Sequence, residues 1–470
     1  MDTILSAYAE GAADLPKYRR LADAIRGAIA AGQLAAGDKL PPVRDLAFDL
    51  GITPGTVARA YTILTDGGAA RAEVGRGTFV AGGEAGGMRK LLPDAPWPQT
   101  EAPQSGRFVS FVAPKLPDCG QIALIREGFA RLSRHPFESL INYPSRAAFK
   151  PAREAVLDWL SDTPLGPVSE EDLTLCHGGQ NGIGIVMQTV LRGARPVVLV
   201  EELSYPGFRR AAELLRAEVV SVPMDEDGIL PEALDELARR HDAQLLCTSP
   251  EIHNPTGRQT PDRRRKEIAA VAQRRGFHVL EDDCYRLGPR AGLGYRALLP
   301  EQGWLVASIS KSITPALRVG FVVAPQARRA DLRRSVEHGF FGLAQPLGDL
   351  VADLLRRPEL PAILDEVRRE YDRYIRAAVN LLGGHDVGWR EGVPFLWLRL
   401  PAGWRAATFV QAAEFEGVQL RAADEFALRD GFAPHAVRIA INAQVGLPAF
   451  EAALGRVRGL LENPPERIAV

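Results

Sequence analysis

The sequence predicts two domains of different class: a short helical N-terminal domain with a winged helix-turn-helix, and a long α/β domain with a mainly parallel, doubly wound sheet and a smaller α+β subdomain. Three observations predict this organisation. A chain of 470 residues is too long for one ordinary core. The segment 81–107 is rich in glycine, proline and polar residues, which is typical of a flexible linker. Beyond it, short apolar runs alternate with amphipathic helical segments, so we place the domains at 1–80 and 108–470, with a large subdomain at about 150–345.

The composition is that of a globular protein, with 46% hydrophobic and 24% charged residues. The formal net charge of −1 argues against a chain that is basic throughout. The four cysteines lie far apart in the sequence, which excludes a CxxC-type metal motif and a disulfide framework. The N-terminus lacks the pattern of a signal peptide, and no apolar run is long enough to span a bilayer. We therefore expect a cytoplasmic protein with no metal site and no membrane contact.

Lysine is rare in this chain: seven of the 57 basic residues are lysine and the others are arginine. Arginine does not give up its proton near neutral pH, whereas a desolvated lysine can. If the protein uses an amine as a nucleophile, only a few residues can supply it.

The N-terminal domain shows the signals of a helix-turn-helix followed by a wing. Apolar residues at helical spacing predict a helix over 17–33, and shorter helices are expected at 43–50 and 54–65. Thr53 can cap the last of these with its hydroxyl, and a proline occupies the first helical position after it, which also favours a helix start there. The glycines in 75–80 predict a tight turn between two short strands.

The run KLPPVRDLAFDLGITPGTVARAYTILTDGG and the later GRGTFV resemble the winged helix of the GntR family. The segment 17–80 carries nine basic and six acidic residues, a mild positive charge that fits contact with DNA phosphates. In such a domain, arginines and helix N-termini position the protein on the backbone, and the recognition helix reads base edges. The resemblance implies that double-stranded operator DNA is contacted by Arg44, Thr53, Thr56, Arg59, Arg76 and Thr78.

In the α/β domain, polar residues gather where the predicted strands end. Apolar runs predict strands at 197–200, 219–222, 244–248, 277–280 and 304–306. Ligands of such sheets bind beyond the carboxyl ends of the strands. The residues found there are a glycine-rich turn at 178–182 that opens a helix, Tyr205, Asn254, the acidic run 281–283 with Tyr285, and Ser308 with Lys311.

Together these residues meet the needs of one cofactor. Pyridoxal 5′-phosphate requires an amine to form an imine, an acid against its pyridine nitrogen, a hydroxyl donor for its phenolic oxygen and an anion cradle. Each residue alone has a plainer explanation, since a glycine turn is usually only a turn and a lone lysine is usually a solvated surface group. Their order and spacing favour the cofactor site.

From about Phe108 to its end, the chain resembles the fold-type I aminotransferases, which bind pyridoxal phosphate. The resemblance implies that Lys311 is the Schiff-base lysine, that Asp282 pairs with the pyridinium nitrogen and that Tyr285 takes part in catalysis. It further implies contacts to the phenolic oxygen from Tyr285 and Asn254, stacking by Tyr205, and a phosphate cradle made of Gly179, Gln180, Ser308 and Arg318.

The resemblance also implies how a substrate and a second subunit would bind. Arg438, with Asn254, matches the position that holds the substrate carboxylate, where a planar guanidinium fits. Tyr143 matches a tyrosine that reaches the partner subunit's phosphate, which implies a homodimer. His253 stands where glutamine is common before Asn254. The residue pair that follows Tyr205 is Pro-Gly, so a second carboxylate-binding arginine is missing there.

A GntR-type winged helix joined by a linker to an aminotransferase-like domain is the layout of the MocR/GabR subgroup of regulators. We therefore predict a DNA-binding transcriptional regulator that senses pyridoxal phosphate or a small amino compound through an imine at Lys311. The alternative is a working aminotransferase with an accessory DNA-binding domain, since nothing in its cofactor site is disabled. A structural protein with a vestigial cofactor fold fits least well, because the lysine, the acid, the tyrosine and the arginine are all present.

Overall fold

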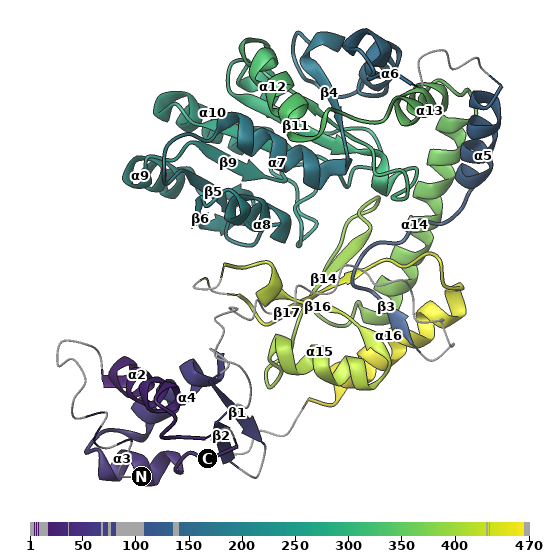
Figure 1. Cartoon of the computed structure of the whole chain (residues 1–470). Helices are drawn as coiled ribbons and strands as arrows, with labels where there is room; N and C mark the ends of the chain where they lie inside the picture. Colours follow the sequence, from purple (N-terminus) through teal and green to yellow (C-terminus); the bar gives the residue numbers. More distant parts are fainter. Residues whose placement is uncertain are drawn as a thin grey trace. The chain divides into compact units, whose positions relative to one another are not determined.

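The computed structural model describes residues 17–35, 37–66, 69–73, 77–80, 108–134, 141–428, 431 and 433–464, together with Ile4, Ser6 and Tyr8. The chain divides into two compact units, Met1–Pro103 and Gln104–Val470. Figure 1 shows both units, and each is described here by itself. The predicted linker 81–107 and Arg76 lie outside the described residues.

The fully described helices of the N-terminal unit number three, and they share one core beside a two-stranded wing. Its elements are α2 (Lys17–Ala30), α3 (Val43–Asp49), α4 (Pro54–Asp66), β1 (Ala70–Glu73) and β2 (Gly77–Val80). Leu21 and Ile25 of α2 pack with Leu46 of α3 and Val57 of α4, and all four are fully buried. The strands β1 and β2 form the antiparallel hairpin that the glycine pattern predicts. The predicted winged helix-turn-helix is therefore the observed fold.

The cap of α4 also forms as predicted. The Thr53 hydroxyl accepts a hydrogen bond from the Thr56 backbone N–H at 3.3 Å, and Pro54 begins the helix. Gly51, in the turn before it, has a φ of +61°, a conformation that glycine adopts without strain. This turn connects α3 to α4, the two helices of the helix-turn-helix.

A seven-stranded sheet forms the centre of the C-terminal unit. Its strand order is β4 (Leu173–Cys176), β12 (Gly320–Val323), β11 (Gly303–Ser308), β10 (His278–Asp282), β9 (Leu245–Thr248), β5 (Val197–Glu201) and β6 (Glu218–Val222). The pairs from β11 to β6 are parallel, and β12 runs antiparallel to both of its neighbours. The sheet is therefore mainly parallel, as the alternating pattern predicts.

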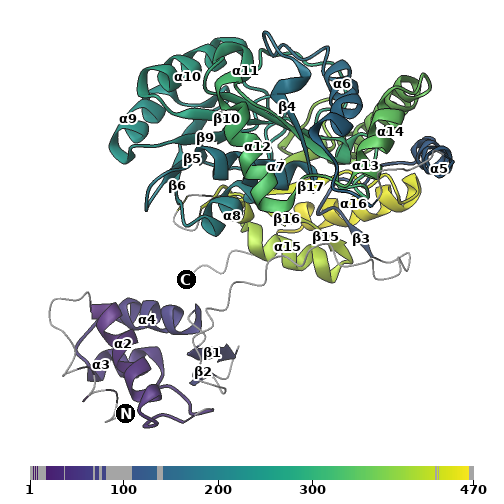
Figure 2. The same cartoon turned by 45° about the horizontal axis from the view of Figure 1, so that its top comes forward.

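Helices cover both faces of this sheet (Figures 1 and 2). One face packs against α7 (Gly178–Val190), α8 (Pro206–Leu214) and α12 (Arg329–Phe340). The other face packs against α9 (Pro231–His241), α10 (Asp262–Arg275) and α11 (Tyr295–Leu298) near β5, β9 and β10. Towards β4 it packs against α6 (Lys150–Trp159) and α13 (Gln345–Leu355), with α5 (Gln121–Leu132) beside them. Residues that alternate along one strand thus enter different cores.

A smaller subdomain is built on a second sheet, of order β13 (Val387–Gly388), β14 (Phe395–Arg399), β17 (Ala436–Ala440) and β16 (Arg421–Ala422). The short strands β15 (Val418–Gln419) and β3 (Val109–Ser110) pair in parallel beside it. Three helices cover this subdomain: α14 (Leu360–Leu382), α15 (Ala406–Phe415) and α16 (Leu447–Glu462). A last short hairpin, β7 (Met224–Asp225) and β8 (Gly228–Ile229), follows β6.

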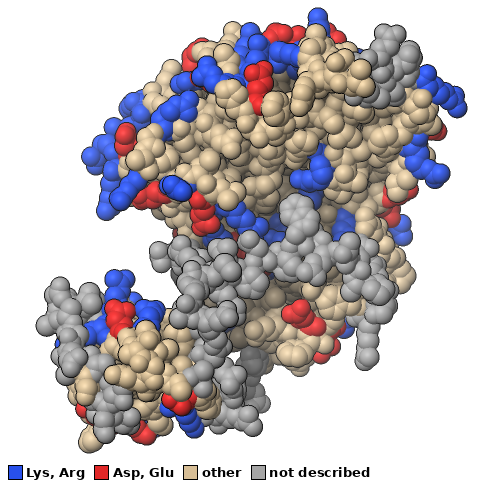
Figure 3. All heavy atoms as spheres, in the orientation of Figure 1, with Lys and Arg blue, Asp and Glu red and all other residues tan. Residues whose placement is uncertain are grey.

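Lys and Arg side chains are interspersed with Asp and Glu over the visible face of the C-terminal unit (Figure 3). This distribution agrees with the nearly neutral net charge of the chain. Among the described helices, none is both long enough and apolar enough to cross a membrane.

Candidate functional site

The carboxyl ends of three neighbouring strands lie level with one another. Glu281 of β10 is in register with Thr248 of β9, and Asp282 is in register with Val306 of β11. Asn254 follows β9, and Lys311 ends a short 3₁₀ helix, Ile309–Lys311, directly after β11. The sheet thus brings the predicted acid, amide and amine to one edge.

Asp282 is the last residue of β10 and is 7% exposed. Its Oδ1 accepts a hydrogen bond from the Cys284 backbone N–H at 3.1 Å. Burial raises the pKa of Asp282 to about 6, partly offset by hydrogen bonds from Cys284, and no basic group in the described part of the chain is among the causes. A buried carboxyl without a cation is suited to receive one from a ligand.

Lys311 faces the aromatic ring of Tyr285, with its Nζ 5.7 Å from the ring centroid. The Tyr285 ring packs edge-on against Phe395 of β14, with centroids 5.2 Å apart. Tyr285 therefore lies between the proposed lysine and the smaller subdomain. The Ser308 hydroxyl accepts from the Ser310 backbone N–H at 3.4 Å, which caps the turn that carries Lys311.

The N-terminus of α7 is open to close approach because its first two residues are glycine. A Cβ on Gly178, whose φ is +80°, would come within 2.8 Å of Nη2 of Arg318. A Cβ on Gly179 would come within 2.4 Å of the Cys284 Sγ. The guanidinium of Arg318 thus lies against the helix N-terminus, and both favour an anion such as a phosphate.

Tyr205 and Gln180 meet above Gly207 in the first turn of α8. The amide of Gln180 donates to the Gly207 carbonyl at 3.0 Å. A Cβ on Gly207 would clash with Gln180 Oε1 and the Tyr205 ring, both at 2.1 Å, so a larger residue cannot replace this glycine without moving them. The Pro-Gly pair that stands where some regulators have an arginine therefore has a packing reason.

Asn254 connects the strand ends to the smaller subdomain. Its Oδ1 accepts a hydrogen bond from Nη1 of Arg438 at 2.6 Å, and its buried Nδ2 has no partner among the described residues. Arg438 also donates to the Val112 carbonyl at 2.6 Å and lies between the rings of Phe395 and Phe426, 5.3 and 5.0 Å from their centroids. Burial lowers the pKa of Arg438, and no carboxylate of the described residues forms a salt bridge with it. The guanidinium is thus held by neutral groups.

Two buried groups near the site were not found from the sequence. Glu201, the last residue of β5, accepts from the Thr248 hydroxyl at 2.5 Å and the Ser249 N–H at 3.0 Å. Its Oε2 has no hydrogen-bond partner in the described structure and lies 3.7 Å from Nε2 of the buried His253. Burial raises the pKa of Glu201 to about 8. Cys284 lies against Gly179, and burial raises the pKa of its thiol. The position of Glu201 at the end of a wholly buried strand was the signal available in the sequence.

Tyr143 is not brought together with the other predicted residues in this chain. Its side chain is 85% exposed and stacks on Phe341, with centroids 5.6 Å apart. Phe341 is itself exposed and has a φ of +60°.

The predicted DNA contacts of the N-terminal unit lie at its surface. Arg44 is exposed on α3, and Arg59 is exposed on α4 with its guanidinium 4.2 Å from the Tyr18 ring centroid. Thr56 bonds to the Thr53 hydroxyl at 2.9 Å, and Thr78 lies on the wing strand β2.

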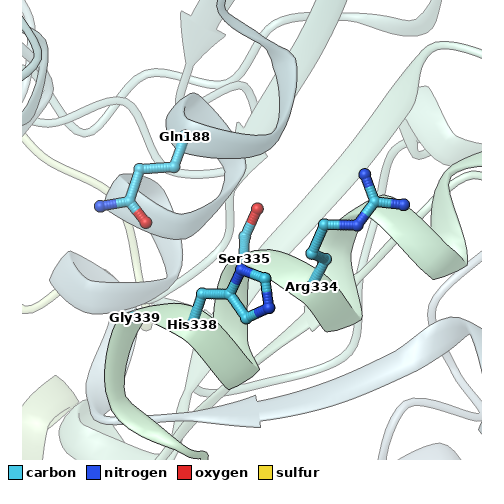
Figure 4. Close-up of a pocket in the computed structure, with 5 residues that line it drawn as sticks. All are labelled: Gln188, Arg334, Ser335, His338 and Gly339. Atoms are coloured by element: carbon cyan, nitrogen blue, oxygen red, sulfur yellow. The ribbon is translucent and has the colours of Figure 1, made fainter.

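A separate hollow of about 300 Å³ lies between α7 and α12, lined by Gln188, Arg334, Ser335, His338 and Gly339 (Figure 4). Gln188 is ten residues beyond Gly178 on α7, which corresponds to ~15 Å along a helix. This hollow is therefore distinct from the strand-end site. Among the described residues, no group of three or more His, Cys, Asp or Glu side chains could hold a metal ion.

Comparison with known families agrees with this geometry. Residues 120–457 match the family model of aminotransferase class I and II, and residues 17–80 match that of bacterial regulatory proteins of the gntR family. The chain belongs to the aminotransferase class I and II family. The predicted combination of a GntR-type winged helix with a fold-type I aminotransferase domain is confirmed.

Two regulators and one enzyme illustrate the similarity. The pyridoxine biosynthesis transcriptional regulator PdxR of Corynebacterium glutamicum is 28% identical, and the match covers 77% of each chain. The probable rhizopine catabolism regulatory protein MocR of Rhizobium meliloti is 25% identical over 80% of this chain and 79% of that one. The structure of LysN, an α-aminoadipate aminotransferase of Thermus thermophilus, superposes with a TM-score of 0.66 at 26% identity, over 76% of this chain and 92% of that one. The two matched family models, together with the two regulators, place the chain in the MocR-like subgroup of transcriptional regulators.

The family implies pyridoxal phosphate, and the residues of this aminotransferase-like unit fit that cofactor. The unpartnered Nδ2 of Asn254 can donate to a phenolic oxygen, and the cation-free carboxyl of Asp282 can receive a pyridinium N–H. The N-terminus of α7, with Arg318 against it, can take the phosphate. LysN was itself solved in complex with N-(5′-phosphopyridoxyl)-L-leucine.

Proposed function

We propose that this regulator binds pyridoxal 5′-phosphate through Lys311 and that the state of this site controls the affinity of its winged helix for operator DNA. The observation that carries the proposal is a strand-end site with unsatisfied buried groups, in the same chain as a winged helix with exposed basic residues. When bound, the cofactor supplies an aldehyde that forms imines with amines and a ring that withdraws electrons.

The chain's own residues have separate tasks in this proposal. Lys311 supplies the amine, and Tyr285, 5.7 Å away, lies where its hydroxyl can contact the phenolic oxygen together with Asn254. Asp282 holds the proton of the pyridine nitrogen, and Tyr205 covers the ring. Arg438 receives the carboxylate of an amino compound, because its partners in the structure are neutral.

A homodimer is part of this proposal. Tyr143 is far too exposed for an ordinary core residue, and its resemblance to a tyrosine that crosses to a partner subunit explains that exposure. Sedimentation of the wild-type chain should give the mass of a dimer, and a monomer at micromolar concentration would contradict this part.

The cofactor site is tested by Lys311→Ala with Lys266→Ala, an exposed lysine on α10, as the matched control. We expect the wild type and the control to show the visible absorbance band of a lysine-bound pyridoxal after reconstitution. Lys311→Ala should lose it. The absence of the band from the reconstituted wild type would defeat the cofactor proposal.

DNA binding is tested by fluorescence anisotropy with the fragment upstream of the protein's own gene. Arg44→Ala should weaken binding, and the slope of log K against log salt should fall by about 0.9 if one phosphate contact is lost. Arg263→Ala, an exposed arginine of the C-terminal unit, is the control and should change neither value. Equal binding by all three proteins would argue against the predicted DNA contact.

An aminotransferase activity is the second candidate, favoured by the presence of Lys311, Asp282 and Arg438 in one site. Turnover of amino donors to keto acids at about 1 s⁻¹ or faster would be typical of an enzyme. Turnover well below that rate, with DNA binding that responds to the cofactor, favours the regulator.

A further inference from the structure

His253 is a buried histidine whose two ring nitrogens are both hydrogen-bonded. Its Nε2 lies 2.7 Å from the Leu203 carbonyl oxygen, and its Nδ1 lies 2.7 Å from the Thr256 hydroxyl. A carbonyl oxygen can only accept, so Nε2 carries the hydrogen. Burial lowers the pKa of His253 to about 4, so the ring is neutral near pH 7 and its Nδ1 accepts from Thr256. The tautomer of this histidine is therefore fixed by its neighbours.

The two bonds of the ring join the two loops that carry predicted cofactor contacts. Thr256 belongs to the turn that follows β9, which is closed by backbone bonds from His253 to Arg258 at 2.8 Å and from Gly257 to His253 at 2.7 Å. This turn contains Asn254. Leu203 belongs to the loop that follows β5 and leads to Tyr205 at the start of α8.

The Leu203 loop also contacts the smaller subdomain. Leu203 forms an isolated antiparallel bridge with Ala427, and the Ser204 N–H donates to the Phe426 carbonyl at 2.8 Å. The ring of Phe426 lies 5.0 Å from the guanidinium carbon of Arg438. Arg438 in turn donates to Asn254, the neighbour of His253.

These contacts form a closed circuit that runs from His253 through Leu203, Ser204, Phe426, Arg438 and Asn254 back to His253. Four of its steps are non-covalent contacts between described residues, and two are peptide bonds, Leu203–Ser204 and His253–Asn254. The circuit crosses twice between the large and the smaller subdomain. The only side chain that links the two large-subdomain loops within this circuit is that of His253.

We propose that His253 is a positioning residue that couples the cofactor contacts of Asn254 and Tyr205 to the docking of the segment 426–427. The part of this proposal that concerns cofactor binding rests on the proposed function. The part that concerns the docking of the two loops does not. Without the imidazole bridge, the loop of Leu203 loses a bond to the turn of Asn254. We then expect looser docking of Phe426 and poorer alignment of the Asn254 amide.

Two conservative replacements separate the bridge from simple filling of space. The amide nitrogen of glutamine can reach the position of Nε2 and donate to the Leu203 carbonyl. The amide of asparagine reaches only the position of Nδ1, next to Thr256. We therefore expect His253→Gln to retain the connection between the loops and His253→Asn to lose it.

The first measurement uses the protein without added cofactor. Hydrogen–deuterium exchange of the peptide that contains the Ser204 N–H should be about tenfold faster in His253→Asn than in the wild type, as for the loss of one buried hydrogen bond. The exchange in His253→Gln should stay within about twofold of the wild type. Equal protection in both variants would overturn the proposal.

The second measurement is the affinity for pyridoxal phosphate and the pH at which the visible band changes. In His253→Asn the affinity should be about tenfold weaker and the pH of the transition should shift. In His253→Gln both should match the wild type. If the asparagine variant does not fold, Thr256→Val removes the hydroxyl that orients Nδ1 and should produce a smaller change in the same direction. A wild type that binds no cofactor would defeat the proposed function, whereas unchanged exchange would defeat only the role of His253.

Discussion

The two faces of strand β10 bury charge in opposite ways. Glu281 points to the α10 side, where Arg265, Arg290, Glu251 and Glu281 form a cluster that we call the arginine cluster. Asp282, the next residue, points to the α7 side, as does Leu280 two positions before it. Three further buried polar residues lie at or beyond the strand ends, namely Glu201, Asn254 and Arg438, and together with Asp282 we call them the open group.

The arginine cluster is saturated with partners. Arg265 donates to Glu251 at 2.8 Å and to the carbonyls of residues 250, 260 and 293. Arg290 pairs with Glu281, whose other oxygen accepts from the Tyr295 N–H at 2.8 Å. Within the described residues, each member of the open group has, in contrast, a buried polar atom without a hydrogen-bond partner or a carboxyl that no basic side chain stabilises. The difference teaches which buried charges support the fold and which are left for a ligand.

The largest effect is expected from breaking the arginine cluster. Arg290→Met removes the nearest cation from the buried Glu281 and leaves only Arg265, at 3.9 Å, as a charged partner. This should lower the free energy of unfolding of the C-terminal unit by about 3–5 kcal/mol. Denaturant unfolding followed by tryptophan fluorescence measures this unit, because residues 1–80 contain no tryptophan. The control Arg263→Met removes a side chain that is 65% exposed, and the loss should be below about 1 kcal/mol. Similar losses in both variants would remove the distinction that we draw.

A substitution in the open group should raise, and not lower, the free energy of unfolding of the protein without cofactor. The folded-state pKa of Asp282 is raised to about 6, so its burial is least costly at low pH, and stability is lost as the pH rises through 6. Asp282→Asn should therefore stabilise the cofactor-free unit by up to ~3 kcal/mol at pH 7.5. The same variant should gain less stability from added pyridoxal phosphate, because it offers no negative charge to the pyridinium.

Thermal unfolding at pH 7.5, with and without the cofactor, measures both effects of this substitution. Asp353→Asn is the control, since that carboxylate is already paired with Arg131 near the surface. If Asp282→Asn unfolds at a lower temperature than the wild type without cofactor, the Asp282 carboxylate supports the fold, as the charges of the arginine cluster do.

Three residues of the cofactor site could be predicted from the sequence, whereas the arginine cluster could not, because only the former follow a recognisable strand end. Lys311, Asp282 and Asn254 stand where apolar strand runs stop, so the edge of the sheet predicts their proximity. Arg265 stands among other charged residues at the start of α10, and nothing in its identity distinguishes it from Arg263. The structure buries the first completely and leaves the second exposed, because the buried face of the helix passes through position 265.

Contacts between residues far apart in the chain were also beyond prediction. The bond from Arg438 to Asn254 joins positions 184 residues apart, and the bond from His253 to Leu203 joins two loops. The motif matches to the fold-type I aminotransferases implied a carboxylate-binding arginine and an altered neighbour of Asn254. They did not predict that both belong to one circuit, because that depends on how the smaller subdomain packs against the large one.

The smallest expected effect concerns Glu201, the other buried carboxyl of the open group. Burial raises its pKa from 4.5 to about 8, so the folded chain holds a proton that the unfolded chain has released, and stability falls as the pH rises towards 8. Glu201→Gln has no proton to lose. The difference in unfolding free energy between this variant and the wild type should therefore shift in favour of the variant by ~2 kcal/mol between pH 6.5 and pH 8. The carbonyl of glutamine can keep the bonds from Thr248 and Ser249, so any pH-independent difference in stability cancels from this comparison.

The control is Glu213→Gln, at an exposed position on α8, whose unfolding free energy should change with pH in parallel with that of the wild type. If the unfolding free energy of Glu201→Gln also changes with pH in parallel with the wild type, the Glu201 carboxyl is paired in solution, as the carboxylates of the arginine cluster are.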